Sequence, residues 1–339
     1  MAAVRKNAPI ATWNEGETVQ GFALLRKKEM RQDRNGRDYL DLELSDATGT
    51  VMAKAWSDSQ AMSGEFAAKE YVAFRGAVRV YRDQLQLNLE QCRRAADDDR
   101  RFGFDEDRLI PTTPESIDDL QKRLQAIFPG AIERPVLQLL VEEALRRYGA
   151  ELREHPAAKS IHHAYRGGLL EHVVSMAELV LKISAHYPDL DRDLLLVGVL
   201  FHDLGKLREL GAMPANDYTL GGQLVGHVVM GRDLLLECCR EIGEVPTNLQ
   251  LHLEHLVLSH QGRREYGSPV EPSTPEAFVL HFVDDLDSKL NQLRGARSGD
   301  AQQYVKGLGR SVFPGGLPAD EDDEKAPRTP AELVSPGAA

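Results

Sequence analysis

Residues 18–95 alternate between apolar and polar side chains with the period of two that is typical of half-buried β-strands. The clearest stretch is Tyr39–Leu44, in which leucines occupy every second position. Turn signals separate such stretches: an Asn-Gly pair lies within Gln32–Arg37, and Arg82-Asp83-Gln84 lies between two alternating runs. Four or five strands, with a helical pattern only near Ser57–Lys69, predict a small closed β-barrel.

The pattern changes to a period of 3.6 residues from Pro114 onward, which predicts an all-α domain over residues 114–310. Prolines punctuate this region, and the expected helices span 115–128, 132–149, 166–187, 191–203, 222–242, 246–260 and 275–293. The chain is therefore expected to be a multidomain α and β protein, in which a barrel over residues 18–95 precedes a helical domain.

Three further segments lack a clear period. Residues 1–17 are expected to be a flexible lead-in, and residues 96–113, with the charged run Asp97–Arg101, a linker. Residues 311–339 are rich in proline, glycine and acidic residues, which predicts a disordered acidic tail.

Composition narrows the class of protein. The 339 residues include 41 Lys and Arg and 53 Asp and Glu, so the net charge is −12. Any nucleic-acid binding must therefore be local, and residues 18–95, with 13 basic and 11 acidic residues, are the only relatively basic part. The longest apolar run, Leu194–Phe201, is too short to cross a membrane, and the first residues lack the apolar core of a secretory signal. Three cysteines without a Cys-x-x-Cys pair favour a reducing, cytoplasmic location.

Candidate chemistry is concentrated in the helical region. The apolar run ends in Phe201-His202-Asp203-Leu204-Gly205-Lys206, where Gly205 can end the helix. An imidazole beside a carboxylate is a natural pair of ligands for a divalent metal. His172, His227, His260 and Asp284 also lie on or at the ends of amphipathic helices, and a helical bundle can bring such side chains together in its core.

These residues resemble a known family. His172, His202-Asp203 and Asp284 follow the H…HD…D pattern of the HD-domain metal-dependent phosphohydrolases. The stretches His162–His172, His202–Lys206, Leu258–Gly262 and Asp284–Asn291 are further similar to the YhaM-type 3′→5′ exoribonucleases. Proteins of that family carry an OB-fold before the HD domain, and the resemblance covers roughly residues 18–295.

The resemblance implies roles for individual residues. His172, His202, Asp203 and Asp284 would hold one metal ion, and Asp203 would bridge to a second ion bound by His227 and His260. Lys206 would contact the scissile phosphate, so Asp203 and Lys206 are the expected catalytic residues. The spacing also places a second aspartate at Asp287. Gln261 departs from the pattern, because many HD proteins have a second histidine at this position. The resemblance therefore leaves open whether the site binds one ion or two.

Two choices about the metal site follow from the residues themselves. Imidazole and carboxylate ligands without thiolate suit Mn²⁺, the expected ion, or Co²⁺, Fe²⁺ or Zn²⁺, better than Ca²⁺. His255 could replace His260 as a ligand, because both lie on one predicted helix about 140° apart, so only one of them should point inward.

An OB-type barrel would supply the contacts to a polymer substrate. Such barrels bind single strands through a basic groove and stacked aromatic side chains. Tyr39 is opposite in phase to Leu40, Leu42 and Leu44 and should face outward. The candidate contacts to nucleic acid are Arg26, Lys27, Lys28, Arg37, Tyr39, Lys54, Trp56, Phe74, Arg79 and Tyr81.

The expected function is therefore a metal-dependent 3′→5′ exonuclease that acts on single-stranded RNA and, as a further option, single-stranded DNA. One alternative is an HD phosphohydrolase acting on small or cyclic nucleotides, because fold alone does not select the substrate. A second alternative is a non-catalytic, nucleic-acid-binding regulatory protein. No membrane partner is expected, and self-association is left open.

Overall fold

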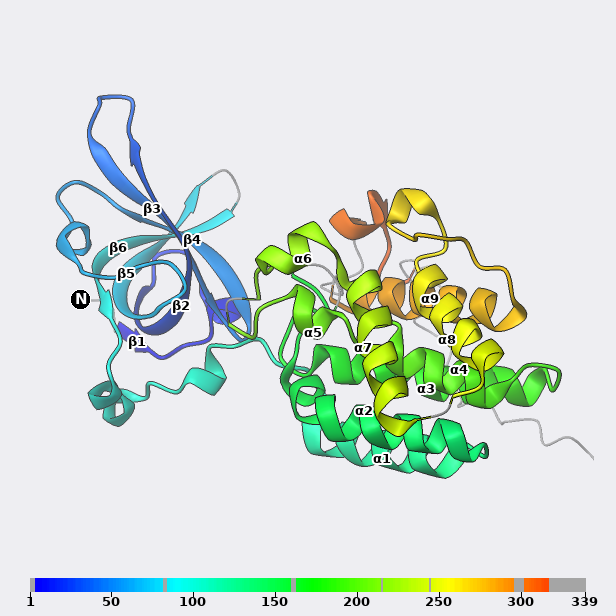
Figure 1. Ribbon diagram of the computed structural model, residues 1–339. Coiled ribbons are helices and arrows are strands. Elements are labelled where there is room, and N and C mark those ends of the chain that lie inside the picture. The colour runs from blue at the N-terminus through cyan, green and yellow to red at the C-terminus, as the bar shows by residue number, and fades with distance from the viewer. Residues whose placement is uncertain are drawn as a thin grey trace, which may run out of the picture. The chain divides into compact units, whose positions relative to one another are not determined.

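The computed structural model describes residues 4–81, 84–159, 163–214, 216–243, 245–295 and 302–316 (Figure 1). The described residues up to Ser288 form one compact unit, and those from Lys289 onward form a second. The first holds a β-barrel and most of the helical region. The predicted arrangement of a barrel followed by helices is confirmed.

A closed barrel occupies the first part of the chain. Its strands are β1 (Val4–Lys6), β2 (Thr18–Gln32), β3 (Asp38–Asp46), β4 (Gly49–Ala55), β5 (Tyr71–Tyr81) and β6 (Gln84–Arg94). The sheet order is β1-β2-β3-β4-β6-β5, and a further pairing of β2 with β5 closes the barrel. The closed ring consists of β2, β3, β4, β6 and β5, and its neighbouring strands are antiparallel except for the parallel pair β4–β6. Five strands in this Greek-key order form the OB topology.

The alternating pattern produces this barrel by filling its interior from every second position. Leu40, Leu42 and Leu44 of β3 are at most 2% exposed. Strand β2 is long enough to pair with both β3 and β5, and a register shift between Leu25 and Lys27 marks an irregularity in its ladder with β3. The barrel has its own apolar core, separate from that of the helices.

The prediction of a flexible lead-in is wrong for residues 4–13. β1 pairs with β2 in parallel, and a short 3₁₀ helix, η1 (Ile10–Thr12), follows it. Ile10 and Trp13 are buried in the barrel core, and the indole of Trp13 donates to the carbonyl of Ala8. These two large side chains anchor the segment because their burial removes apolar surface from water.

Residues 96–113 are also more structured than a linker. They contain two 3₁₀ helices, η3 (Asp97–Phe102) and η4 (Glu106–Arg108). Two hydrogen bonds of 2.7 Å from Arg93 lower the pKa of Asp99 to about 2 and hold η3 to the end of β6. The expected helical pattern near Ser57–Lys69 is present only as the 3₁₀ turn η2 (Gln60–Ser63).

The helical region matches the predicted elements closely. Its helices are α1 (Ile117–Ala131), α2 (Pro135–Glu154), α3 (Gly168–His186), α4 (Arg192–Phe201), α5 (Lys206–Glu209), α6 (Leu220–Leu224), α7 (His227–Ile242), α8 (Thr247–Ser259) and α9 (Pro275–Gly295). The expected helix over 222–242 is broken, because Gly226 has a φ of 81° and ends the short α6 before α7 begins. A small hairpin, β7 (Gln303–Val305) and β8 (Arg310–Val312), lies within a region expected to be helical or disordered.

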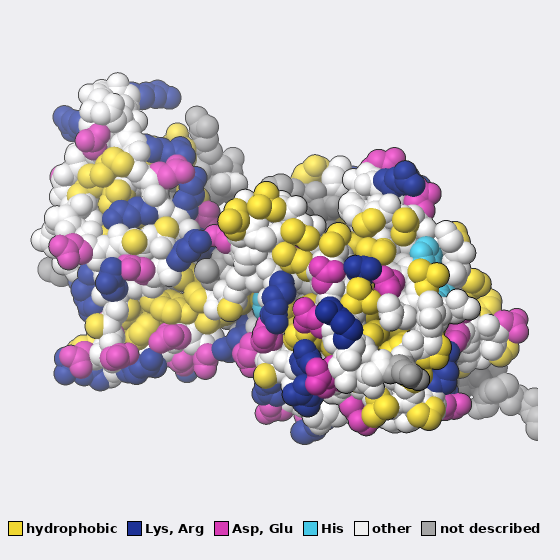
Figure 2. Space-filling model, viewed as in Figure 1, with side chains coloured by type: hydrophobic (Ala, Val, Ile, Leu, Met, Phe, Trp, Pro, Cys, Tyr) yellow, Lys and Arg dark blue, Asp and Glu magenta, His cyan; other side chains and the backbone are white. Residues whose placement is uncertain are grey.

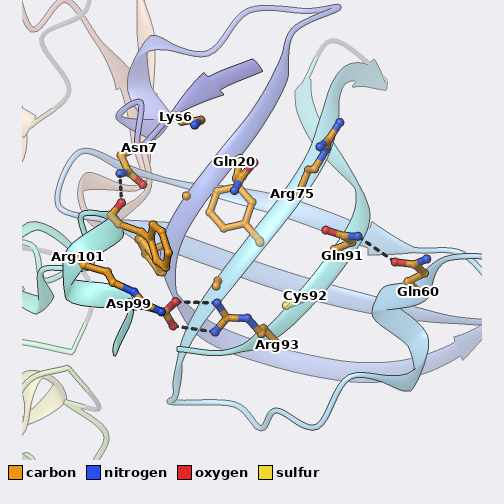
Figure 3. A pocket seen from close by; sticks show the side chains of 15 residues that line it. Lys6, Asn7, Gln20, Gln60, Arg75, Gln91, Cys92, Arg93, Asp99 and Arg101 are labelled. Carbon is orange, nitrogen blue, oxygen red and sulfur yellow. Dashed lines mark hydrogen bonds and ion pairs between the residues drawn. The ribbon is translucent and has the colours of Figure 1, made fainter. Parts of the chain in front are cut away.

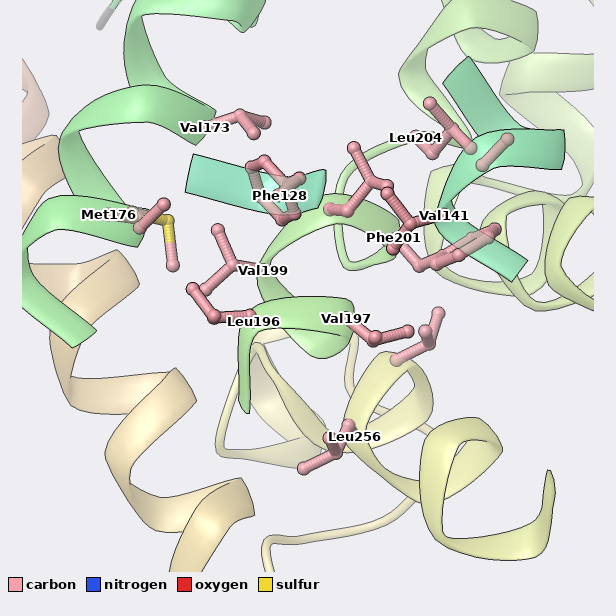
Figure 4. Close-up of a cluster of buried hydrophobic side chains, with 14 of the residues drawn as sticks. Phe128, Val141, Val173, Met176, Leu196, Val197, Val199, Phe201, Leu204 and Leu256 are labelled. Carbon is pink, nitrogen blue, oxygen red and sulfur yellow. The ribbon is translucent and has the colours of Figure 1, made fainter. Parts of the chain in front are cut away.

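Helix α4 is the centre of the helical core. Every residue from Asp193 to Phe201 is buried. Figure 4 shows its side chains among residues of other helices, including Phe128 of α1, Val141 of α2 and Leu256 of α8. An all-round apolar helix is stable only when other elements surround it. This burial carries the residues that follow Phe201 into the interior.

Two predictions concern the ends and surroundings of the chain. Residues 317–339, which hold most of the expected acidic tail, lie outside the described residues. Within the described part of the chain, every helix is too short or too polar to span a bilayer. The cysteines Cys92, Cys238 and Cys239 are free and buried.

Candidate active site

A tight turn after α4 places the His-Asp pair in the core. His202 and Asp203 follow Phe201 directly and are 0% and 1% exposed. Gly205 does not end the helix through a left-handed conformation, as the sequence suggested, because its φ is −59° and its ψ is −20°. A side chain here would instead collide with the carbonyl oxygen of His227 and the amide nitrogen of Gly231. Glycine is required because the start of α7 lies against this turn.

A Gly205→Ala variant is expected to lose about 1–3 kcal/mol of stability, because the backbone of α7 must move to admit the methyl group. The matched change Gly149→Ala lies inside α2 with nothing within 4 Å, and should leave stability unchanged or raise it by up to about 1 kcal/mol. Urea unfolding of both variants measures the difference. Equal stability of the two would contradict the close packing described here.

One half of a His/Asp cluster surrounds the Nε2 atom of His172. This atom lies 3.3 Å from Oδ1 of Asp284 and 3.3 Å from Nε2 of His202. Oδ2 of Asp203 lies 3.7 Å from Nε2 of His172 and 3.4 Å from Nε2 of His202. The four residues that the family resemblance assigns to one metal therefore converge from α3, the turn after α4, and α9.

The other half of the cluster faces the second oxygen of Asp203. Oδ1 of Asp203 lies 3.5 Å from Nε2 of His227 and 3.7 Å from Nε2 of His260. It is buried and has no hydrogen-bond donor among the described residues. His260 is fully buried, whereas His255 accepts a hydrogen bond from the amide of Ser273 at 3.0 Å, so the inward residue of the pair is His260.

These two halves could hold metal. Ligand atoms that lie within 4.8 Å of one another come from His172, His202 and Asp203 on one side and from Asp203, His227 and His260 on the other. A buried carboxylate oxygen without a donor, facing two imidazole nitrogens, is the arrangement that a cation satisfies. The donor set of imidazole and carboxylate therefore fits a divalent ion.

Hydrogen bonds outside the cluster orient its imidazoles. The Nδ1 atoms of His202 and His260 face the carbonyl oxygens of Val199 and Val257, at 2.8 and 2.7 Å. Nδ1 of His227 lies 3.0 Å from a carboxylate oxygen of Glu209. Because each Nδ1 faces an acceptor, it carries the proton, and the Nε2 lone pair points into the cluster.

Burial and neighbouring charges shift the pKa values of Asp203 and of groups close to it. Burial favours the neutral form of Asp203, but the ammonium group of Lys206 holds the pKa of this carboxyl well below its usual range. Burial likewise opposes the charge on Lys206, yet Asp203, which accepts a hydrogen bond from it, raises the pKa of that lysine. For His260, burial lowers the pKa to about 3, so its imidazole is neutral at pH 7.

A network of hydrogen-bonded polar side chains supports His172, and the sequence predicted only part of it. Its Nδ1 lies 2.7 Å from Oδ2 of Asp287, the second aspartate of the α9 motif. Asp287 also contacts His163 at 3.1 Å and accepts a hydrogen bond from Ser175. His163 is buried, and its contacts with Asp287 and Tyr165 give it a packing role. Glu209 carried no recognisable signal, because its role depends on α7 lying beside it.

An Asp287→Asn variant is expected to weaken divalent metal binding by about 10- to 100-fold. The neutral amide removes the charge that holds the His172 ring with Nε2 inward, and loss of such partners usually costs this much affinity. Isothermal titration with Mn²⁺ measures the effect. The control, Asp233→Asn, changes an exposed carboxylate of α7 and should bind Mn²⁺ normally. Equal affinities would show that Asp287 does not orient the ligand.

The candidate contacts to nucleic acid divide into separate groups on the barrel. The rings of Tyr39 and Trp56 lie 5.2 Å apart on the outer face of β3 and β4, and Nζ of Lys54 lies 4.4 Å from the centre of the Tyr39 ring. Arg26 and Lys27 of β2 are also outward but pair with Glu43 and Glu29. Arg37, Arg79 and Tyr81 are exposed near strand ends.

Two of these candidates do not form part of an open surface. Phe74 is 5% exposed and packs in the barrel core, with its ring centre 5.7 Å from that of Trp13, so the predicted stacking role is wrong. Its phase matches that of Val72 and Val78, which also point inward. Lys28 donates to the carbonyl of Phe66 and lies over its ring.

A cavity of about 650 Å³ lies on another wall of the barrel, formed by β2, β5, β6 and η3 (Figure 3). It contains Arg75 and Arg93, but these pair with Glu90 and Asp99. On the visible face of the barrel in Figure 2, basic side chains are likewise interspersed with acidic ones. Half-buried Tyr39 and exposed Trp56 thus lie beside a lysine, Lys54, that also pairs with Asp41 at 3.6 Å. On the cavity wall, Arg101 lies over the ring of exposed Phe102.

Comparisons with known proteins agree with this construction. The profile of the family described as HD domain matches residues 169–289, and that of a family described as putative helicase matches residues 117–188. The OB-type barrel and the buried His/Asp cluster within an HD domain define a metal-dependent hydrolase. The chain is 36% identical over 285 residues to the 3′-5′ exoribonuclease YhaM of Bacillus pumilus (strain SAFR-032), a match that spans 84% of this chain and 89% of that protein. The chain thus belongs to the YhaM 3′-5′ exoribonuclease family.

Solved structures resemble parts of the chain only distantly. A replication protein A heterotrimer bound to single-stranded DNA is 17% identical in sequence, with a TM-score of 0.21. The match covers 29% of this chain and 77% of that chain. The second OB-fold domain of replication protein A from Methanococcus maripaludis is 16% identical, also with a TM-score of 0.21. That match covers 26% of this chain and 92% of that chain.

Proposed function

We propose that this protein is a 3′→5′ exonuclease of single-stranded RNA, in which the HD cluster hydrolyses the terminal phosphodiester bond and the barrel binds the strand. The observation that supports it most directly is the convergence of four imidazoles, His172, His202, His227 and His260, on the two oxygens of Asp203, within a family of exoribonucleases. Asp284 adds a second carboxylate, 3.3 Å from Nε2 of His172. The direction of attack is taken from the family alone.

The proposed chemistry assigns one task to each part of the cluster. His172, His202, Asp203 and Asp284 would hold one ion, and Asp203, His227 and His260 a second. A divalent ion in such a site lowers the pKa of water and neutralises charge on phosphate oxygens. Lys206 holds an ammonium group beside Asp203 and is the proposed contact to the scissile phosphate, where it would offset developing negative charge.

Mn²⁺ is the proposed ion. Mixed imidazole and carboxylate ligands suit Mn²⁺, Fe²⁺, Co²⁺ or Zn²⁺ better than Ca²⁺, which prefers oxygen ligands alone. The ligand groups found among the described residues contain imidazoles and carboxylates but no thiol. Cys238 and Cys239 are buried in α7, and burial raises the pKa of the Cys238 thiol to about 12.

The proposed strand-binding surface is the outer face of β3 and β4. Tyr39 and Trp56 offer ring faces, and Trp56 is 38% exposed. The ammonium group of Lys54 lies beside both rings and 3.6 Å from a carboxylate oxygen of Asp41. Single-strand binding by OB folds combines base stacking with a cationic backbone contact, and this group provides both.

A labelling experiment tests the proposal. Single-stranded RNA labelled at its 5′ or its 3′ end is incubated with the purified protein and Mn²⁺, Co²⁺, Mg²⁺ or Zn²⁺. The expected result is a ladder of shortened 5′-labelled products and immediate release of the 3′ label as a mononucleotide, with no cleavage in chelator. Turnover of free or cyclic nucleotides without any ladder would instead support the small-nucleotide alternative.

A further inference from the structure

Gln261 occupies a place in the cluster that no ligand assignment explains. Its side-chain nitrogen lies 3.0 Å from Nε2 of His260 and 3.4 Å from Nε2 of His227. The turn that follows α8 holds it there, because Gly262 has a φ of 81° and leaves no room for a side chain beside the ring of His281. His281 in turn faces the carbonyl oxygen of His260 at 2.8 Å.

Three acceptors converge at this point of the cluster. Glu209 and the carbonyl of Val257 take up the Nδ1–H groups of His227 and His260, so both Nε2 atoms present lone pairs. Oδ1 of Asp203, the third acceptor, has no donor among the described residues. The amide of Gln261 is the polar group that the structure places against the two imidazoles.

An amide side chain can serve such a site in two ways. Its NH₂ group donates hydrogen bonds, and its carbonyl oxygen is a metal ligand of the kind found in oxygen-rich sites. The two ends differ only by rotation of the amide about its last bond, and their assignment follows from the hydrogen-bond network. In the orientation seen here, the NH₂ group faces the imidazole lone pairs of His227 and His260.

We propose that Gln261 is a reversible ligand of the second divalent ion: its NH₂ group satisfies His227 and His260 when that ion is absent, and its Oε1 atom joins them and Asp203 when the ion binds. This inference rests on the proposed metal-dependent function. An amide oxygen is a harder ligand than an imidazole, so the second site favours Mn²⁺ or Mg²⁺ relative to Zn²⁺. The second ion is bound more weakly than the first and exchanges more readily.

Metal binding by the full-length protein tests this role directly. Manganese is titrated into the metal-free wild type and into Gln261→Leu, Gln261→Glu and Gln261→His by calorimetry, and the paramagnetic resonance of the bound Mn²⁺ reports coupled ion pairs. The control is Gln250→Leu, which makes the same change on α8, where the amide contacts Glu254.

The wild type and the Gln250→Leu control are expected to bind two Mn²⁺ ions, with a resonance signal typical of a coupled pair. Gln261→Leu should keep the tighter site unchanged and weaken the second by at least about tenfold, as loss of supporting groups at metal sites commonly does. Gln261→Glu should recover the second site because it keeps Oε1. Gln261→His should shift that site's preference toward Zn²⁺.

Other outcomes would overturn the inference in distinguishable ways. Two unchanged sites in Gln261→Leu, or a Glu variant no better than the Leu variant, would exclude Gln261 as a ligand. Equal loss of both sites would assign it a structural role instead. A wild type that binds a single ion would reject the inference alone and leave the hydrolase proposal standing. A wild type that binds no divalent ion would contradict the proposed metal-dependent function itself.

Discussion

An Asp203→Asn protein is expected to hydrolyse single-stranded RNA at least about 10³-fold more slowly than the wild type at saturating Mn²⁺. Asp203 directs one oxygen to His172 and His202 and the other to His227 and His260, so a neutral amide weakens both halves of the cluster. Electrostatic stabilisation by bound metal is worth several kcal/mol, and each 1.36 kcal/mol is a factor of ten in rate. Single-turnover cleavage of labelled RNA measures the loss.

The same substitution also leaves the ammonium group of buried Lys206 without its carboxylate partner, so folding must be checked separately. Circular dichroism and urea unfolding of the variant provide this check. Asp189→Asn alters an exposed carboxylate before α4 and should retain full activity. A folded Asp203→Asn protein with wild-type activity, after contaminating nucleases are excluded, would reject the assignment of the active site.

Replacing both Tyr39 and Trp56 by leucine is expected to weaken binding of a long single-stranded RNA by at least roughly 30-fold. Stacking of a base on an aromatic side chain contributes about 1–3 kcal/mol, and two such positions together contribute at least about 2 kcal/mol. Leucine keeps an apolar side chain at both sites, which limits damage to the fold. Fluorescence anisotropy of labelled RNA measures the dissociation constant.

Hydrolysis of a dinucleotide should be nearly unaffected by this double substitution, because that substrate is too short to depend on the barrel. Phe102→Leu is the matched control, since Phe102 is 62% exposed but lines the cavity on the β2–β5–β6 wall. If RNA binding weakens in Phe102→Leu but not in the double variant, the cavity, and not the outer face of β3 and β4, is the surface that binds the strand.

Much of the His/Asp cluster could be predicted because its signals are local. The run from Leu194 to Phe201 is apolar on all sides, which requires a buried helix, and His202-Asp203 follows immediately. Tyr39 was correctly predicted to face outward because a strand alternates its faces at every residue. The same rule contained the evidence against Phe74, which shares a face with Val72 and Val78.

Other features could not be predicted because they depend on which segments meet. Trp13 lies in a stretch without periodicity, and only the barrel core provides the space that buries it. Gly205 looked like a helix terminator, but the reason for glycine is the backbone of α7, more than 20 residues later in the chain. Glu209 and Gln261 are 52 positions apart in the sequence and both contact His227, so no spacing rule connects them.

The order of residues along the chain thus determined the barrel, the helices and the types of ligand that the core would contain, because periodicity and burial act through neighbours in sequence. Contacts between distant segments decided which imidazole turns inward, which carboxylate supports it and why Gln261 lies against two lone pairs. Those choices depend on distances of about 3 Å between side chains from different helices. Such distances exist only once the helices have packed.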